Sequence, residues 1–150
     1  MLRRGTPLLL AIALASCGDA LTVVMNAQNN SGENGFATLT AKDGKHTHVY
    51  VQLRRPMTGE ETQESHVHPG TCGEIGPIAY RLNPLQPPSA PDNQVEGVPD
   101  DLKKNDDGGY LVSASDIEAG IDELTKGSWV INAHDESDFA LYVSCGQIQK

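Results

Sequence analysis

The chain has 150 residues, which is enough for one domain of ordinary size. It is acidic: 20 Asp and Glu residues stand against 11 Lys and Arg residues, for a net charge of −9. Binding to a phosphate backbone or to anionic lipid needs basic side chains. The composition therefore argues against nucleic acid as a partner and against membrane binding through a polybasic segment.

The N-terminal segment has the layout of an export signal. A short basic start with Arg3 and Arg4 precedes a wholly apolar run from Leu8 to Leu14, and small residues then lead to Cys17. The apolar run is too short to cross a bilayer as a helix, and its flanks are those of a secretory signal. We therefore expect the protein to be exported.

The end of this segment resembles the lipobox of bacterial lipoproteins, in which the cysteine is lipidated and becomes the first residue of the mature chain. The resemblance implies a lipoprotein signal peptide over residues 1–16, a lipidated tether over residues 17–20 and a membrane anchor on Cys17. The protein would then face the periplasm or the cell exterior. An ordinary signal peptide, in which Cys17 has no role, is the alternative.

Export also bears on the remaining cysteines and on the charge. With Cys17 lipidated, Cys72 and Cys145 are an even pair in an oxidising compartment, and we expect them to form a disulfide. Such a bridge would contribute roughly 4 kcal/mol to the free energy of unfolding in the chain-entropy model.

Removal of the signal peptide would also remove Arg3 and Arg4. The mature chain from Cys17 would then carry nine basic residues against 20 acidic residues, for a net charge of −11.

Residues 21–150 alternate short strand patterns with turn clusters, and no internal repeat stands out. Long loops are expected over residues 83–109, and one or two helical turns from Ile117 to Leu124, ending at Gly127. The strands are predicted over residues 21–27, 36–41, 48–53, 64–68, 76–82, 110–114, 129–134 and 139–144. This pattern predicts an all-β fold, either an antiparallel sandwich or a Greek-key β-barrel of about eight strands.

The strand around His66 carries the strongest chemical signal. Side chains on a strand alternate between faces, so His66 and His68 point to one side while Val67 points to the other. Two imidazoles in this arrangement can occupy two positions on one metal ion. A pair of solvated surface histidines is the alternative interpretation.

Further histidines are candidates for the same site. His48 lies opposite the apolar positions of its strand, and it would come near His68 if residues 48–53 and 64–68 form a simple hairpin. His134 ends a strand with its apolar residues on the other face, so we expect it to face outward as well. Glu64 shares the face of His66 and is a further ligand candidate, whereas His46 reads as an exposed turn residue.

The order of these residues resembles that of the copper–zinc superoxide dismutases. His66-Val67-His68, Cys72, a strand ending in His134 and then Cys145-Gly146 follow the same sequence along the chain. The resemblance implies a Greek-key β-barrel of immunoglobulin-like superoxide dismutase type over residues 21–150. It also implies one copper ion held by His66, His68 and His134, and a disulfide between Cys72 and Cys145.

The departures from that family limit what the resemblance implies. No histidine lies between His68 and His134, so the family's bridging histidine and its zinc site are missing. The arginine that precedes the family's last cysteine, and guides superoxide, has no counterpart among residues 138–144. The chain is therefore closer to superoxide dismutase-like and chordin-type domains of exported bacterial proteins.

Three functions remain open from the sequence. The first is a copper-binding domain with redox activity toward a small oxidant such as superoxide. The second is a copper carrier or storage protein without turnover. The third is a metal-free structural or adhesive lipoprotein module that uses the barrel only as a scaffold.

Overall fold

The computed structural model describes residues 20–56, 62–89, 95, 97–105 and 109–150. The predicted signal peptide over residues 1–16, the lipidation site Cys17 and the rest of the tether as far as residue 19 lie outside the described residues. Among the helices of the described part, none is long and apolar enough to cross a membrane.

Strands dominate the described part of the chain, with only two short helices, α1 (Asp100–Asn105) and α2 (Ile121–Lys126). The strands are β1 (Leu21–Ala27), β2 (Asn34–Ala41), β3 (Thr47–Arg54), β4 (Ser65–Thr71), β5 (Glu74–Ile75), β6 (Tyr80–Arg81), β7 (Tyr110–Ile117), β8 (Trp129–His134) and β9 (Tyr142–Ile148). The predicted bounds of the first strand and of the strand ending at His134 are confirmed exactly as residues 21–27 and 129–134.

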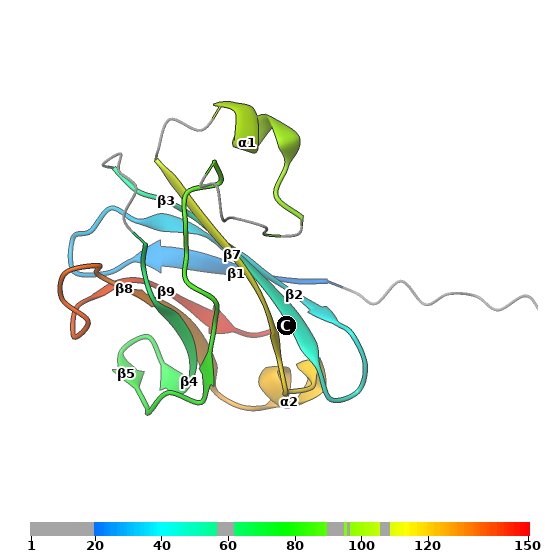
Figure 1. Ribbon diagram of the computed structural model, residues 1–150. Coiled ribbons are helices and arrows are strands. Elements are labelled where there is room, and N and C mark those ends of the chain that lie inside the picture. The colour runs from blue at the N-terminus through cyan, green and yellow to red at the C-terminus, as the bar shows by residue number, and fades with distance from the viewer. Residues whose placement is uncertain (1–19, 57–61, 90–94, 96, 106–108) are drawn as a thin grey trace, which may run out of the picture.

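All strand pairs in this sheet are antiparallel, and their order is β5-β4-β8-β9-β1-β2-β3-β7, with β6 also paired to β4. Figure 1 shows that the sheet is strongly curled rather than flat. The neighbours β3–β7, β4–β8 and β1–β9 are not consecutive in the chain, and three connections, from β3 to β4, from β6 to β7 and from β7 to β8, pass between the halves of the sheet, as in Greek-key proteins. The predicted all-β class is confirmed.

The segment from β6 to Gln86 bridges the two halves of the curled sheet. On one side, Leu85 exchanges two backbone hydrogen bonds with Gln63, which precedes β4. On the other side, Gln86 exchanges two backbone hydrogen bonds with Val112 of β7. This short bridge brings the edges β4 and β7 together and encloses the apolar interior.

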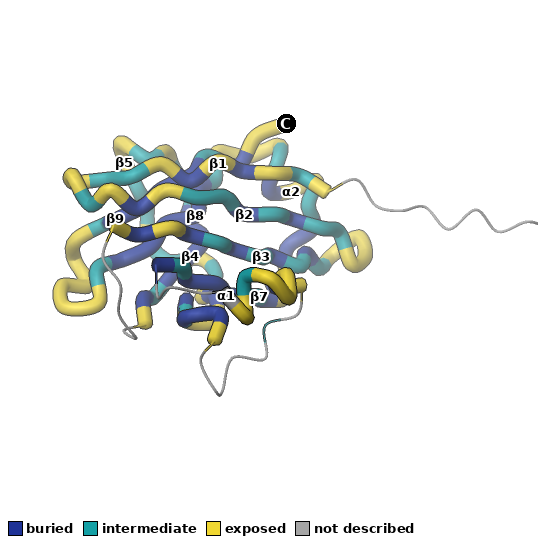
Figure 2. The backbone as a smooth tube through the Cα atoms, turned by 90° about the horizontal axis from the view of Figure 1, so that it is seen from above, coloured by how far each residue is buried: buried dark blue, intermediate teal, exposed yellow. Residues whose placement is uncertain are grey.

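The hydrophobic core fills the inside of this curl. Alternate residues of each strand point inward, and Figure 2 shows the buried positions along the strands while α1 lies largely exposed at the surface. Strand β4 contributes Val67 to the core, and its neighbour β8 contributes Ile131. Because these two residues point inward, the residues that alternate with them point to the outer face of the sheet.

Several strands begin or end a few residues from their predicted bounds, and two differ more strongly from the structure. The last strand was expected over residues 139–144, but β9 begins at Tyr142. Asp135 Oδ1 accepts hydrogen bonds from the backbone of Ser137 and Asp138, so the chain turns there and Phe139 stays in the loop between β8 and β9. The strand expected over residues 76–82 is reduced to β6, Tyr80–Arg81, because Pro77 has no backbone N–H to donate to a ladder.

The disulfide between Cys72 and Cys145 is present. It joins the turn that follows β4 to β9, two segments that are separated in the sheet by β8. The bridge therefore fastens the end of β4 across its neighbour to the last strand, on the same part of the sheet that carries the histidines.

Candidate metal centre

Strands β4 and β8 bring three histidines together. His66 and His68 stand on β4, and the backbone N–H of His134, at the end of β8, donates to the carbonyl of Glu64. One ring nitrogen from each of the three histidines lies within 4.8 Å of the others. The predicted convergence of His66, His68 and His134 is therefore found in the structure, and a group of this kind could hold a metal ion.

Backbone carbonyls orient two of the three rings. The Nδ1 atom of His68 lies 2.9 Å from the carbonyl oxygen of Gly76, and Nδ1 of His134 lies 2.6 Å from that of Phe139. A carbonyl oxygen only accepts hydrogen bonds, so both Nδ1 atoms carry the proton and both Nε2 atoms keep a lone pair. Such outer bonds are typical of histidines that bind metals through the opposite nitrogen.

The remaining ring nitrogens of the cluster lie close together. His66 Nδ1 lies 3.0 Å from His134 Nε2, and the buried Nε2 of His68 has no hydrogen-bond partner. A buried ring nitrogen without a partner costs free energy unless something else binds it. A metal ion in this cluster would therefore be held by Nδ1 of His66 and by Nε2 of His68 and His134, at the distances of about 2.0–2.1 Å that are usual for imidazole ligands.

Burial favours the neutral form of two of these rings, His66 and His134. The exposed fractions are 0% for His66 and 3% for both His68 and His134, although all three point away from the hydrophobic core. Desolvation, helped by the nearby charges of His134, His68 and Arg81, lowers the pKa of His66 to about 4. Burial also lowers the pKa of His134. Neutral imidazole is the form that binds metals, so the lowered pKa values of His66 and His134 favour the binding form of both rings.

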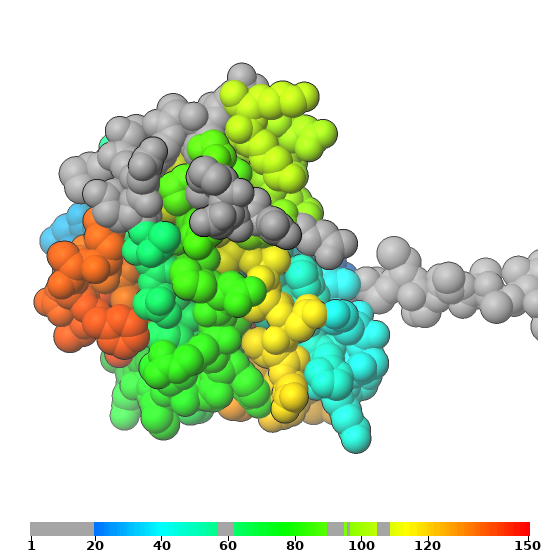
Figure 3. Space-filling model, in the orientation of Figure 1, coloured from blue at the N-terminus to red at the C-terminus, as the bar shows by residue number. Residues whose placement is uncertain are grey.

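The loop between β8 and β9 covers the outer side of the cluster. The ring of Phe139 stacks on His134 with centroids 4.3 Å apart and an angle of 6° between the planes, and it also contacts His66 edge-on at 5.5 Å. Figure 3 shows this loop, in orange, packed beside the start of β4. Phe139 itself is 49% exposed, so it separates the histidines from solvent.

Two charged residues flank His66 on the side away from the cluster. Arg81 of β6 pairs with His66 across the β4–β6 ladder, and its Nη1 atom lies 3.3 Å from His66 Nε2. Glu64 Oε2 lies 3.9 Å from the same nitrogen. The sequence placed Glu64 on this face, but it gave no signal for Arg81, because only the pairing of β6 with β4 brings that residue to the site.

Asn132 is a further residue of this face that the sequence did not reveal. It pairs with His66 of β4 on one side and with Cys145 of β9 on the other, so its side chain shares their outer face. The residue is fully buried, and neither its amide oxygen nor its amide nitrogen has a hydrogen-bond partner. The outer face of β4 and β8 therefore holds unsatisfied polar groups beside the three rings.

His48 does not belong to this group. The expected hairpin between residues 48–53 and 64–68 is wrong, because β3 pairs with β2 and β7 while β4 pairs with β5, β6 and β8. His48 Nδ1 instead lies 2.7 Å from Asp116 of β7, which also binds Lys42. Hydrogen bonds from Lys42 and His48 lower the pKa of Asp116. His46 is a turn residue that pairs with Asp43.

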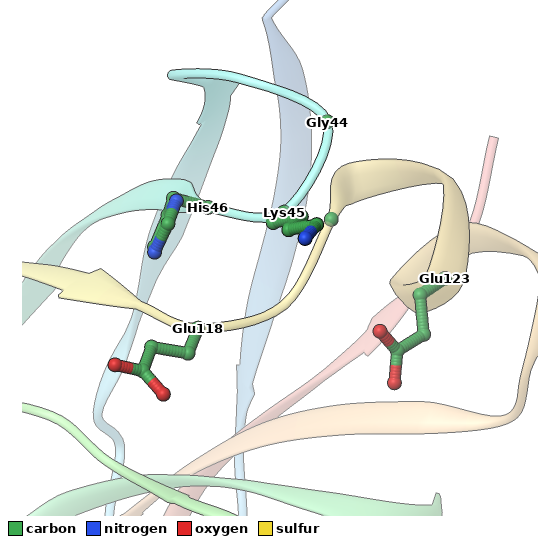
Figure 4. Close-up of a pocket in the computed structure, with 6 residues that line it drawn as sticks. Gly44, Lys45, His46, Glu118 and Glu123 are labelled. Atoms are coloured by element: carbon green, nitrogen blue, oxygen red, sulfur yellow. The ribbon is translucent and has the colours of Figure 1, made fainter.

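A hollow in the described part of the molecule lies near α2. It has a volume of about 480 Å³ and lies between the β2–β3 turn and α2, lined by Gly44, Lys45, His46, Glu118, Gly120 and Glu123. Figure 4 shows that the carboxylates of Glu118 and Glu123 lie apart and that neither points toward the ring of His46. This hollow therefore assembles no set of ligands or catalytic groups, unlike the histidine cluster.

Comparison with the models of known protein families and with curated proteins gives no match to this chain. The metals that this site could bind are therefore inferred from its own three histidines. Three neutral imidazoles without a thiolate suit copper, zinc or nickel by ligand type.

Proposed function

We propose that this protein is an exported lipoprotein whose β-domain binds one copper ion through His66, His68 and His134. The observation that carries the proposal is the convergence of three buried ring nitrogens, two of them freed as lone-pair donors by hydrogen bonds to backbone carbonyls. Copper ranks high in affinity for nitrogen ligands. The resemblance to the superoxide dismutases in the order of these residues favours copper over zinc or nickel.

A bound copper ion would supply one-electron transfer to a small oxidant such as superoxide. The residues of the chain contribute the three ligands, a cover over His134 from Phe139 and a guanidinium from Arg81 beside His66. Arg81 is a local positive charge in a strongly acidic chain, and an anion would otherwise be repelled by the net charge. The family's zinc site has no counterpart in the sequence.

Copper carriage or storage without turnover is the second candidate function. The observation that favours it is the burial of the three rings, which are at most 3% exposed. A site closed in this way retains an ion well but limits the approach of a substrate. A carrier would show tight, reversible copper uptake and no dismutation of superoxide.

Titration of the disulfide-intact protein with Cu(II), followed by electron paramagnetic resonance, tests the proposal. We expect one equivalent to bind in a nitrogen-rich site, and His66→Ala/His134→Ala to abolish that binding. The matched control is His46→Ala/His48→Ala, which also removes two histidines but leaves the cluster intact. Unchanged copper binding in the first variant would contradict the proposal, and so would unchanged thermal stability on adding copper, since a ligand of the folded state must stabilise it.

Membrane anchoring is a separate part of the proposal. It predicts that the protein made in a bacterial cell carries lipid and fractionates with membranes, and that Cys17→Ser abolishes both properties. Mass spectrometry of the mature N-terminus measures this directly. A mature chain that begins elsewhere and carries no lipid would show an ordinary signal peptide.

A further inference from the structure

His66 differs from the other two histidines because both of its ring nitrogens face side chains, whereas His68 and His134 each have Nδ1 on a backbone carbonyl. Its Nε2 atom lies 3.3 Å from Arg81 Nη1, and its Nδ1 atom lies 3.0 Å from His134 Nε2. Arginine only donates hydrogen bonds, so Nε2 of His66 must be the accepting nitrogen without a proton. The single proton of the neutral ring is then on Nδ1.

The proton on Nδ1 of His66 has a matching acceptor. His134 donates from its own Nδ1 to the carbonyl of Phe139, so its Nε2 offers a lone pair to His66. Hydrogen bonds therefore run in one direction, from Arg81 to His66, from His66 to His134 and from His134 to Phe139. Every group in this chain is satisfied in the metal-free protein, and such connected networks hold their members in place.

A metal ion at Nδ1 of His66 is incompatible with this network. The ion needs the lone pair of Nδ1, so the one proton of the neutral ring must be carried on Nε2 instead. That places two N–H donors, from His66 and Arg81, face to face at a distance of 3.3 Å. Glu64 can act as an acceptor for this proton, because its Oε2 atom lies 3.9 Å from the same nitrogen.

We propose that metal binding exchanges the hydrogen-bond partner of His66 Nε2 from Arg81 to Glu64. The inference rests on the proposed function, because it assumes that the cluster binds an ion. The ring keeps one proton throughout: the proton leaves Nδ1, where the ion binds, and Nε2 gains one. Arg81 thus opposes loading by stabilising the metal-free tautomer, and Glu64 supports loading by accepting from the loaded one.

The surroundings of both residues permit this exchange. Arg81 is exposed, so its guanidinium can turn into solvent without leaving a buried charge behind. The side chain of Glu64 is 45% exposed, and its Oε2 atom, now 3.9 Å from His66 Nε2, needs to move about 1 Å closer to reach hydrogen-bond distance. Both are positioning residues, since each acts on the ion through His66.

Nitrogen NMR of the histidine rings in the full protein tests the exchange directly. Zinc(II) and silver(I) serve as diamagnetic probes. In the metal-free protein we expect the proton of His66 on Nδ1, and in the loaded protein we expect it on Nε2. A proton already on Nε2 before loading overturns the exchange even if metal binds. Failure of copper, zinc and silver all to bind overturns the proposed function itself, and the exchange with it.

Variants of Arg81 distinguish the effect of its hydrogen bond to His66 from the effect of its positive charge. Arg81→Met should raise the affinity for metal about tenfold, the effect of losing one charge-assisted hydrogen bond. The gain should be similar for zinc(II) and silver(I), because the same bond is lost. Repulsion between charges would instead scale with the charge of the ion, which is half as large for silver(I) as for zinc(II). If the gain in binding free energy for silver is only half that for zinc, Arg81 acts through its charge alone and the exchange is wrong. Arg54→Met, which removes a positive charge from β3, is the matched control.

Glu64 provides the opposite test. Glu64→Ala should lower the affinity about tenfold, since the loaded Nε2–H loses its charged acceptor. Glu64→Gln keeps an accepting oxygen and should recover part of that loss. Equal losses in the two variants would show that Glu64 contributes only charge and would overturn its assigned role.

Discussion

His66 connects the chemistry of the site to the stability of the fold at the scale of a single residue. The ring is fully buried, and burial lowers its pKa from an ordinary value of 6.5 to about 4. In the unfolded chain the same ring takes up a proton near pH 6.5. Between these two values the unfolded state binds more protons than the folded state, so the free energy of unfolding falls as the pH is lowered through that window.

We therefore predict that the metal-free protein loses roughly 3 kcal/mol of stability between pH 6.5 and pH 4 through His66. Urea denaturation in the presence of a chelator, repeated across this range, measures the loss. In His66→Gln the dependence on pH should be visibly weaker, because that side chain does not titrate. An equally steep loss in the variant would assign the effect to other groups.

At the scale of structural elements, the β8–β9 loop covers the histidine cluster. Asp135 fixes the turn, and Phe139 lies flat on His134. We predict that Phe139→Ala releases metal several times faster and lowers stability by about 1 kcal/mol, since it removes one stacked pair. Transfer of bound metal to a coloured chelator gives the rate.

Leu141→Ala is the matched control for the loop. Leu141 is 39% exposed, and its backbone bonds to Asp138 and Asp135 survive the substitution. It should therefore leave the rate of metal release unchanged. Equal acceleration in both variants would show that the loop matters only through its general packing.

At the scale of the whole molecule, the disulfide is the main cross-link of a small acidic domain. Cys72 and Cys145 are 73 residues apart in the sequence, and closing a loop of that length contributes roughly 4 kcal/mol. We predict that Cys72→Ser/Cys145→Ser lowers the free energy of unfolding by about that amount, measured by urea denaturation. Cys17→Ser, which leaves the bridge intact, is the control.

The metal site should depend less on this bridge than the stability does. The ligands stand on β4 and β8, which remain joined by their own ladder from Ser65 to Pro69. Under conditions in which the double serine variant is still folded, we expect metal affinity to change by less than tenfold. A complete loss of binding in the folded variant would show that the disulfide positions the histidines directly.

The local pattern of the sequence determined most of the strands and the shared face of two of the three clustered histidines. Alternation of apolar and polar residues defines a strand and its faces, so the strands at residues 21–27 and 129–134 and the shared face of His66 and His68 followed from neighbouring residues alone. The pairing of Cys72 with Cys145 was predicted from the number of cysteines and from the expectation of export, and the convergence of His134 was predicted from a resemblance in residue order.

Only the tertiary structure decided which strands are neighbours, and this settled the rest of the site. Pairing between distant strands depends on the closure of the whole sheet, and alternation within a strand carries no information about it. For that reason His48, expected beside His68, lies next to Asp116 instead. Arg81 and Asn132 were not expected, yet their strands place them on either side of His66.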